Sequence, residues 1–383
     1  MPLISRRLHS AARMLALSAC WVVARGGEPE MPEPSMTLNV MALPREAPSP
    51  ASNPTTPGKV ALGRLLFFDP ILSATKDVAC ATCHHPSLGW ADGRTTPIGV
   101  NGSGIGKERR RSRSDGFPIM QRNAPSILNV AFNGMGPDGR CDPVAAPMFW
   151  DSRVSSLEAQ ALVPIRAAEE MRGDACAESA AIDAALKRVS GNSEYRALFT
   201  KVFGGGEAVT TAHLATALAA FERSLVTADS PFDRFARGGA GALSVLQKRG
   251  LQSFQTAGCA LCHSGPMLSD YKLHFIGTPG QKEMRDFRTP TLRNLKHTAP
   301  YMHNGSLGTL RDVLNFYDRV MDATSETLDG GDAMAHPALD PLLKKLNVNP
   351  GEFTAIEAFL DALNDDSYDR SVPVNVPSGL PVP

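Results

Sequence analysis

Two short segments of the chain bring together side chains that bind metals and can form covalent bonds to a cofactor. Both have the pattern Cys-x-x-Cys-His, with Cys80, Cys83 and His84 in "VACATCHHP" and Cys259, Cys262 and His263 in "GCALCHSGP". Cysteines three positions apart lie on one side of a helical turn, so both sulfurs can form thioethers with the two vinyl groups of one haem. The histidine that follows can then bind the haem iron.

A single match could arise by chance, or belong to a redox dithiol or to half of a zinc site. A zinc ribbon would place its second cysteine pair about 15 to 20 residues after the first, whereas nearly half of the chain separates the two motifs here. The two motifs therefore predict two covalently bound haem c groups. His85, next to the first motif, is interpreted as a surface residue.

The segments before the two motifs resemble each other. "KVALGRLLFFDPILSATKDVACATCHHP" and "LSVLQKRGLQSFQTAGCALCHSGP" each run from an apolar helical pattern with a glycine and a phenylalanine through a loop into the motif. Residues 211–235 and the stretches "LRDVLNFYDRV" and "FTAIEAFLDAL" also show helical spacing, and strand-like alternation is scarce. We expect an internally duplicated, all-α protein of two small haem domains with long loops rich in glycine and proline.

The N-terminus predicts export. Arg6, Arg7 and Arg13 precede the apolar run Met14–Ala24, which is too short to span a bilayer, so residues 1–24 are interpreted as a signal peptide for the periplasm. "VVA" fits an ordinary signal peptidase, whereas "LSAC" fits a lipoprotein site with a lipid anchor at Cys20. We expect no transmembrane span, and the formal net charge of +0 gives no indication of nucleic-acid binding.

Composition suggests the remaining divisions of the chain. Residues 25–58 are rich in proline and are expected to form a linker, followed by an N-terminal haem domain (59–227), a C-terminal haem domain (228–375) and a tail (376–383). The basic run Gly106–Gly116 is interpreted as a solvated loop, with docking of an acidic partner as the alternative. It belongs to an unusual loop from Asp92 to Met120 that could cover the first haem.

Two cysteines remain once the haem motifs and the signal segment are set aside. Cys141 and Cys176 are predicted to form a disulfide, because an even remainder in an oxidising compartment is typical of one; two free cysteines are the alternative.

Three further stretches extend the pattern: "QRNAPSILNVAFNG", "MFWDSRVSSLEAQALVPIRAAEEM" and "TPTLRNLKHTAPYMHNGSLGTL". In this order, around two Cys-x-x-Cys-His units, they resemble the bacterial dihaem cytochrome c peroxidase superfamily, which includes MauG and MbnH. The resemblance runs from about Lys59 to Leu363 and implies two cytochrome c-like domains.

The resemblance implies a peroxide-binding first haem. Peroxidases that need reductive activation carry a histidine ligand in the loop after the first motif, but residues 86–149 contain no histidine here. We therefore expect the iron held by His84 to be open to hydrogen peroxide. Gln160 and Glu170 match family residues near this iron, with Met171 beside them, and a carboxylate there can move a proton between peroxide oxygens.

For the second haem, the resemblance places the sixth iron ligand at Tyr317, as in the MauG and MbnH-like subgroup, rather than the methionine of ordinary peroxidases. The alternative is that Tyr317 packs in the core and Met302 or Met321 binds the iron. A phenolate favours ferric iron, whereas a thioether favours ferrous iron.

Two more family positions are expected between the haems. Trp150 would relay electrons from one iron to the other, although an arbitrary tryptophan would be read as packing. Asn123 and the carbonyls of Thr298 and Pro300 match a Ca²⁺ site, since Ca²⁺ prefers oxygen ligands.

The function expected from the resemblance is a periplasmic oxidoreductase that uses hydrogen peroxide to drive both haems to a shared high-valent state. That state would oxidise a partner such as a tryptophan of a periplasmic protein. The alternatives are a conventional peroxidase, which takes electrons from a small c-type cytochrome, and a dihaem electron carrier without catalysis.

Overall fold

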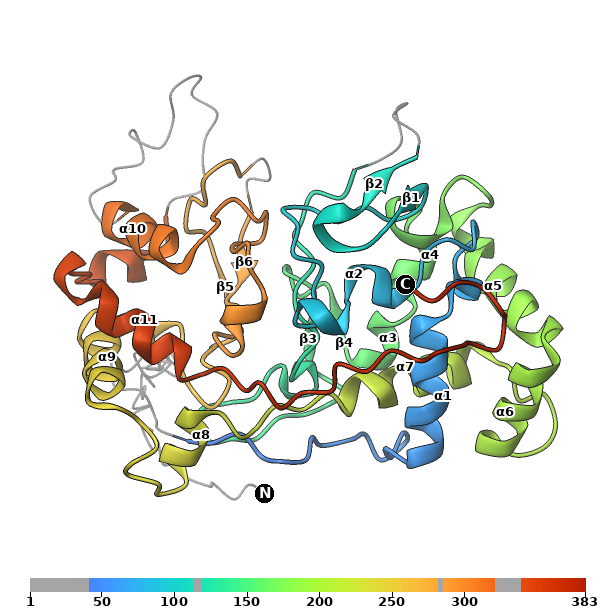
Figure 1. The fold of residues 1–383 in the computed structure, drawn as a ribbon, viewed down its shortest axis with the longest axis horizontal. Helices are drawn as coiled ribbons and strands as arrows, with labels where there is room; N and C mark the ends of the chain where they lie inside the picture. The colour runs from blue at the N-terminus through green and yellow to red at the C-terminus, as the bar shows by residue number, and fades with distance from the viewer. Residues whose placement is uncertain (1–40, 113–118, 282–284, 321–338) are drawn as a thin grey trace, which may run out of the picture. The chain divides into compact units, whose positions relative to one another are not determined.

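A computed structural model describes residues 41–112, 119–281, 285–320 and 339–383, so the expected signal peptide and the first part of the linker lie outside it. Within these residues the chain is mainly helical, and the strands pair into short antiparallel ribbons (Figure 1). The expectation of an all-α fold is confirmed. None of the helices in the described ranges is long and apolar enough to cross a membrane.

The helices are α1 Pro57–Phe68, α2 Cys80–Cys83, α3 Leu157–Gln160, α4 Val163–Arg166, α5 Ala181–Gly191, α6 Ser193–Phe203, α7 Thr211–Arg223, α8 Pro231–Ala236, α9 Val245–Thr256, α10 Leu310–Val320 and α11 Phe353–Asp361. The strands pair as β1 Gly102–Ser103 with β2 Arg110–Arg111, β3 Pro147–Met148 with β4 Val154–Ser155, and β5 Leu273–His274 with β6 Phe287–Arg288.

The helix before each Cys-x-x-Cys-His motif packs closely on a later helix through a glycine. In α1, a Cβ on Gly63 would lie 1.9 Å from the carbonyl oxygen of Ala217 in α7. In α9, a Cβ on Gly250 would lie 1.8 Å from the carbonyl oxygen of Ala355 in α11. The α1–α7 pair thus packs in the same way as the α9–α11 pair (Figure 1). This repeated packing is the structural counterpart of the duplication predicted from the sequence.

A second repeated feature follows each motif and joins the two halves. Asn129 and Asn294 both adopt left-handed backbone conformations, with φ of 62°, and each begins a short 3₁₀ turn. Their side-chain amides donate to the same hydroxyl, that of buried Thr227, at 2.5 and 2.8 Å. The stretches "NAPSILN" and "RTPTLRN" are therefore equivalent turns that meet at one residue.

The buried apolar side chains form separate clusters around the two motifs. The larger cluster joins α1, α5, α6 and α7 and includes Trp90, which is 0% exposed and lies edge-on to Phe67 and Phe68. The second joins α8, α9 and α11 through Phe232, Phe254 and Phe359. Each haem motif thus packs against its own hydrophobic core.

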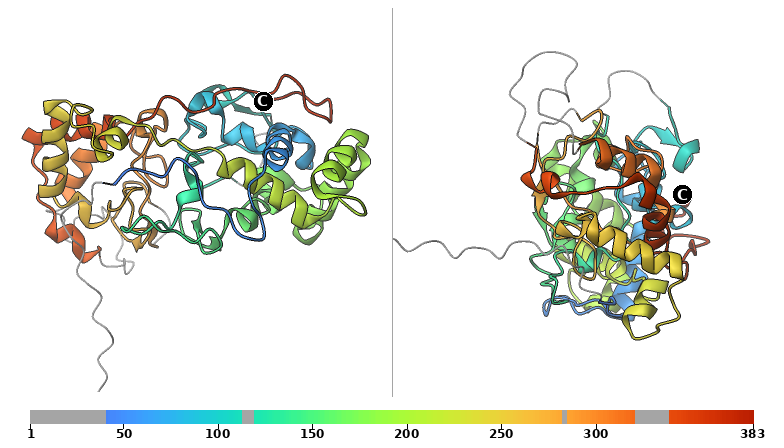
Figure 2. Two further views of the ribbon diagram at one scale, coloured as in Figure 1. Left: turned by 90° about the horizontal axis from the view of Figure 1, so that it is seen from below. Right: turned by 90° about the vertical axis from the view of Figure 1, so that its left-hand side faces the viewer.

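The chain has no helices or strands from residue 41 to the start of α1, or after the end of α11. Both segments are nevertheless held by hydrogen bonds to the rest of the structure. The Leu43 amide donates to Asp233 at 2.9 Å. Beyond α11 the chain runs back to the first cluster (Figures 1 and 2), where the Trp90 indole donates to the Asp369 carbonyl at 3.0 Å and the hydroxyl of Ser378 donates to Asp69 at 2.6 Å. The C-terminal segment therefore stabilises the half that begins the chain.

The expectations of a Cys141–Cys176 disulfide and of an exposed His85 are wrong, and the solvated loop expected at the basic run is found only in part. Cys141 and Cys176 are free: the first packs beside Leu43 and Phe132, whereas the second lies beyond the π-helical turn, where Arg172 donates to its carbonyl. His85 is 7% exposed, with its Nδ1 2.7 Å from the Ser87 hydroxyl. The basic run is exposed at several positions, but Arg109 is only 3% exposed.

Candidate haem and peroxide site

One cavity of about 700 Å³ reaches both Cys-x-x-Cys-His motifs. Every residue proposed from the sequence for haem, peroxide or calcium lines it: Cys80, Cys83, His84, Asn123, Trp150, Gln160, Glu170, Met171, Cys259, Cys262, His263, Thr298, Pro300 and Tyr317. These residues come from segments far apart in the chain, so their convergence on one cavity is a result of the fold.

The first motif lies on a single helical turn. In α2, the Thr82 hydroxyl accepts a hydrogen bond from the Ala79 amide at 2.9 Å, and the His84 amide donates to the Cys80 carbonyl at 3.0 Å. Burial raises the pKa of both thiols, that of Cys83 to about 12. The two sulfurs and the imidazole are thus held together at the cavity wall.

The second motif has the same arrangement on a 3₁₀ turn, Cys259–Leu261, which follows Gly258 with a φ of 84°. The His263 amide donates to the Cys259 carbonyl at 2.9 Å. Burial likewise raises the pKa of Cys259 to about 12.

The residues present fit two haems of the c type. All four cysteines are free, so their sulfurs are available for thioether bonds. In each histidine Nδ1 lies near a backbone carbonyl, at 3.2 Å from Trp90 O for His84 and at 3.0 Å from Leu268 O for His263. Because a carbonyl only accepts hydrogen bonds, Nδ1 carries the proton and Nε2 keeps the lone pair that an iron would bind.

Glu170 and Met171 lie in a π-helical turn, Ala168–Arg172, and Gln160 ends α3. Burial, with a smaller contribution from the negative charge of Glu169, raises the pKa of Glu170 to about 7, against an opposing effect of Arg153. A carboxyl group with this pKa can accept and return a proton near neutral pH. The π-helical turn is notable because such turns often occur at functional sites.

Tyr317 lines the cavity together with Leu310 and Val313. Val313 and Tyr317 follow Leu310 by three and seven positions, so all three lie on one face of α10. Burial, followed by the nearby Cys262 and Cys259, raises the pKa of its phenol. Met302, the alternative ligand, also lines the cavity, and Met321 lies outside the described residues.

Trp150 connects the remaining expected residues. Its indole nitrogen donates to the Asn123 carbonyl at 2.9 Å, and its ring lies edge-on to His303 at 6.4 Å between centroids. The side-chain amide nitrogen of Asn123 donates to the Arg94 carbonyl at 2.7 Å, which leaves its side-chain oxygen as the atom suited to a cation. Thr298 and Pro300 line the same cavity.

Two carboxyl groups at the cavity were not anticipated from the sequence. Glu222 in α7 is 6% exposed, and burial raises its pKa to about 8 although Arg223 opposes the shift. Asp151 forms ion pairs with Arg122 at 2.9 Å and Arg153 at 2.8 Å, which hold its pKa below the usual range despite its burial. Glu222 follows Phe221 in a helical pattern of apolar residues. That pattern does not distinguish Glu222 from the other polar positions of the helix, so the sequence offered no reason to select it.

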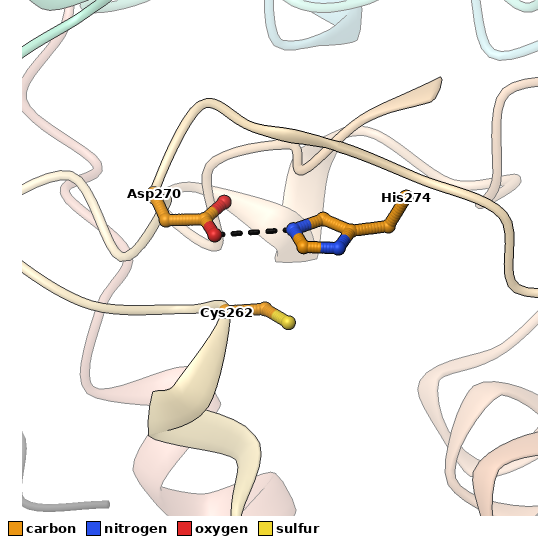
Figure 3. Close-up of side chains that lie close together, drawn as sticks. All are labelled: Cys262, Asp270 and His274. Carbon is orange, nitrogen blue, oxygen red and sulfur yellow. Dashed lines mark hydrogen bonds and ion pairs between the residues drawn. The ribbon is translucent and has the colours of Figure 1, made fainter. Parts of the chain in front are cut away.

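A third unanticipated group lies beside the second motif. Cys262, Asp270 and His274 have ligand atoms within 4.8 Å of one another (Figure 3). The His274 ring lies between two carboxylates, with Nε2 3.1 Å from Asp270 and Nδ1 2.6 Å from Asp340. Burial would lower the pKa of His274, but hydrogen bonds, first from Asp270, raise it to about 11. A thioether at Cys262 would take its sulfur out of any metal site, so we interpret the group as a structural ion cluster.

The fold and the cavity define a class: a helical protein with two c-type haem attachment sites opening on one space. A family model described as di-haem cytochrome c peroxidase matches residues 57–241. The methylamine utilization protein MauG of Methylorubrum extorquens is 36% identical over 345 residues, which cover 86% of this chain and 85% of that protein.

Two other comparisons agree. The cytochrome c551 peroxidase of Nitrosomonas europaea is 30% identical over 355 residues, covering 88% of this chain and 89% of that protein. The crystal structure of a MauG-like protein associated with microbial copper homeostasis matches with a TM-score of 0.66 and 26% identity, covering 90% and 96% of the two chains. The chain belongs to the di-haem cytochrome c peroxidase and MauG family of peroxidase-like oxidoreductases, which carry two c-type haems.

Proposed function

We propose that this protein is a periplasmic, MauG-like oxidoreductase that uses hydrogen peroxide to oxidise a partner, with a tryptophan side chain of an exported protein as the candidate substrate. The observation that carries the proposal is the single cavity in which Glu170, Trp150 and both haem motifs meet. Two haems, when bound, would supply the redox chemistry. His84 and His263 would bind their irons, and the two cysteine pairs would attach them.

Glu170 is the proposed acid and base for peroxide. Its pKa of about 7 lets it take a proton from one peroxide oxygen and return it to the other. Gln160, on the same cavity wall, can orient the peroxide by hydrogen bonds, and Met171 contributes an apolar contact. The absence of histidine from residues 86–149 supports an open first iron, because no imidazole of that loop can occupy its sixth position.

Tyr317 is the proposed sixth ligand of the second haem, supported by its place on the cavity face of α10. A phenolate would stabilise the oxidised iron. Trp150, hydrogen-bonded to Asn123, is the proposed relay between the haems, and Asn123 with the carbonyls of Thr298 and Pro300 is the proposed Ca²⁺ site.

The second candidate is a conventional peroxidase that reduces peroxide with electrons from a small c-type cytochrome. Two observations favour it: Met302 lines the same cavity as Tyr317, and a relative at 30% identity is named a cytochrome c551 peroxidase. In this case a methionine would bind the second iron.

Steady-state turnover with peroxide separates the candidates. The purified dihaem protein would be mixed with hydrogen peroxide, with and without a reduced small c-type cytochrome, and absorbance followed in a stopped-flow instrument. The proposal predicts that the ferric protein reacts with one equivalent of peroxide without prior reduction and oxidises the cytochrome slowly. Rapid cytochrome turnover would support the conventional peroxidase, and indifference to peroxide would leave an electron carrier.

A further inference from the structure

The buried arginine of the basic run holds a loop against the peptide that carries Glu170. We propose that residues 98–111, here called the strap, fix the position of the Glu170 carboxyl, and that Arg109 is the positioning residue that holds the strap in shape. The inference rests on the role proposed for Glu170. It assigns a role to residues 98–111, for which the proposed function above gives none.

The strap touches the Glu170 backbone directly. The Val100 amide donates to the Glu170 carbonyl at 3.0 Å. Gly99 packs so closely that a Cβ at this position would lie 2.2 Å from the Glu169 oxygen and 2.4 Å from the Glu170 oxygen. Only a residue without a side chain fits there, so the strap backbone lies on the turn itself.

The π-helical turn needs such support. Its hydrogen bonds run from the Arg172 amide to the Ala167 carbonyl at 3.0 Å and from the Gly173 amide to the Ala168 carbonyl at 3.1 Å. The carbonyls of Glu170 and Met171 are instead taken by residues distant in the chain, Val100 and, at 2.9 Å, Ala74. The direction of the Glu170 side chain therefore depends on these outside partners.

Arg109 makes the strap a fixed unit. Its guanidinium donates to the carbonyls of Ile98, Gly99 and Gly104 at 2.6, 2.6 and 2.9 Å, and the residue is 3% exposed. Three nitrogens in a planar fork can reach three carbonyls at once, which a lysine ammonium on a flexible stem cannot do in the same geometry. A displacement of about 1 Å at a reacting group can cost on the order of 100-fold in rate.

The test is a double-mutant cycle. Arg109→Gln and Gly99→Ala would each be made alone and together with Glu170→Gln, all as holoproteins. Arg140→Gln, outside the strap and with a side chain that is 91% exposed, and Gly205→Ala, which has no atom within 4 Å of the added Cβ, serve as controls. The rate constant of the ferric protein with hydrogen peroxide would be measured against pH, and hydrogen exchange would be followed in peptides covering residues 98–104 and 168–173.

We expect Arg109→Gln and Gly99→Ala each to lower the rate constant by about 100-fold, to shift its pH midpoint and to speed exchange in both peptides. In the Glu170→Gln background neither change should slow the reaction further, and the controls should behave as wild type. An undiminished loss in that background would overturn the inference, as would a normal rate and pH midpoint in both single variants.

The cycle also separates this inference from the proposed function. If Glu170→Gln alone leaves the rate unchanged, the role of Glu170 is wrong. If Glu170→Gln is slow while the Arg109 and Gly99 variants retain the wild-type rate, only the strap is wrong. Gly99→Ala keeps the Arg109 charge and its donors, so the test does not depend on one variant.

Discussion

In the proposed function, Glu170 is the residue on which the reaction with peroxide depends most directly. A base acts in its deprotonated form, so the rate should rise as the pH increases through about 7, the raised pKa of Glu170. Glu170→Gln should remove this dependence and slow the reaction by roughly 100-fold to 10,000-fold. Both effects would be measured by stopped-flow absorbance from about pH 5 to about pH 9, the range in which such carboxyls titrate.

Glu169→Gln is the matched control, because it changes the neighbouring carboxylate that contributes to the raised pKa of Glu170. It should move the midpoint to lower pH and leave the limiting rate intact. If the Glu169 variant lost the reaction and the Glu170 variant kept it, the base would be Glu169 and the role proposed for Glu170 would be wrong.

Trp150 provides the second residue-scale prediction. Trp150→Phe keeps an aromatic ring at the cavity but removes the easily oxidised indole and its hydrogen bond to Asn123. We expect peroxide still to be consumed at the first haem, while oxidation of the second haem is delayed in freeze-quench spectra. Trp90→Phe, in a core position that is 0% exposed, should lower stability by about 1 to 3 kcal/mol without delaying that transfer. Equal transfer rates in the Trp150 variant and the wild type would exclude the relay.

At the scale of elements, the glycine contacts between helices should limit each half of the molecule. Gly63→Ala and Gly250→Ala push a Cβ into the carbonyls of Ala217 and Ala355, at 1.9 and 1.8 Å. Each should lower the free energy of unfolding by about 1 to 3 kcal/mol through overpacking. Urea denaturation followed by helical circular dichroism would measure the loss.

Gly191→Ala, at the end of α5 with no atom within 4 Å of the added Cβ, is the control for these substitutions. It should be neutral, or more stable by about 0.4 to 1 kcal/mol, because alanine restricts the unfolded chain. If the two buried glycines tolerate alanine equally well, the close helix contacts do not matter for stability.

The sequence predicted those elements whose signal is local. The Cys-x-x-Cys-His motifs, the helices at 211–235 and the glycine-containing repeats before each motif depend on short spacings, and the structure contains them. The basic run Gly106–Gly116 predicts a solvated loop, yet the Arg109 side chain folds inward to carbonyls up to eleven residues away. Partners of that kind leave no periodic pattern in the sequence.

At the scale of the whole molecule, the contacts that could not be predicted are those that cross the chain. His274 lies between carboxylates 4 and 66 positions away, and Trp90 is capped by a carbonyl 279 positions away. The expected disulfide failed for the same reason, since parity of cysteines says nothing about where Cys141 and Cys176 lie. The proposed site residues all line one cavity. That they would lie close together was expected from the family resemblance, because spacing in the sequence does not predict it.

Thr227 tests how the two halves are joined. Thr227→Val keeps the shape but removes the acceptor shared by Asn129 and Asn294, leaving buried amide donors without this partner. The cost should be about 1 to 3 kcal/mol for each such donor, measured by chemical denaturation. Thr227→Ser retains the hydroxyl and should recover most of the stability; a serine variant as unstable as the valine variant would mean that packing of the methyl group matters instead.

The central claim, that Tyr317 binds the second iron while the first stays open to peroxide, has one direct test. Electron paramagnetic resonance spectra of the ferric holoprotein would be recorded before and after one equivalent of hydrogen peroxide, beside Tyr317→Phe. We predict one high-spin and one low-spin signal in wild type, both lost on peroxide addition, and an altered low-spin signal in the variant. Two low-spin signals indifferent to peroxide, or a low-spin signal unchanged by the tyrosine substitution, would contradict the account.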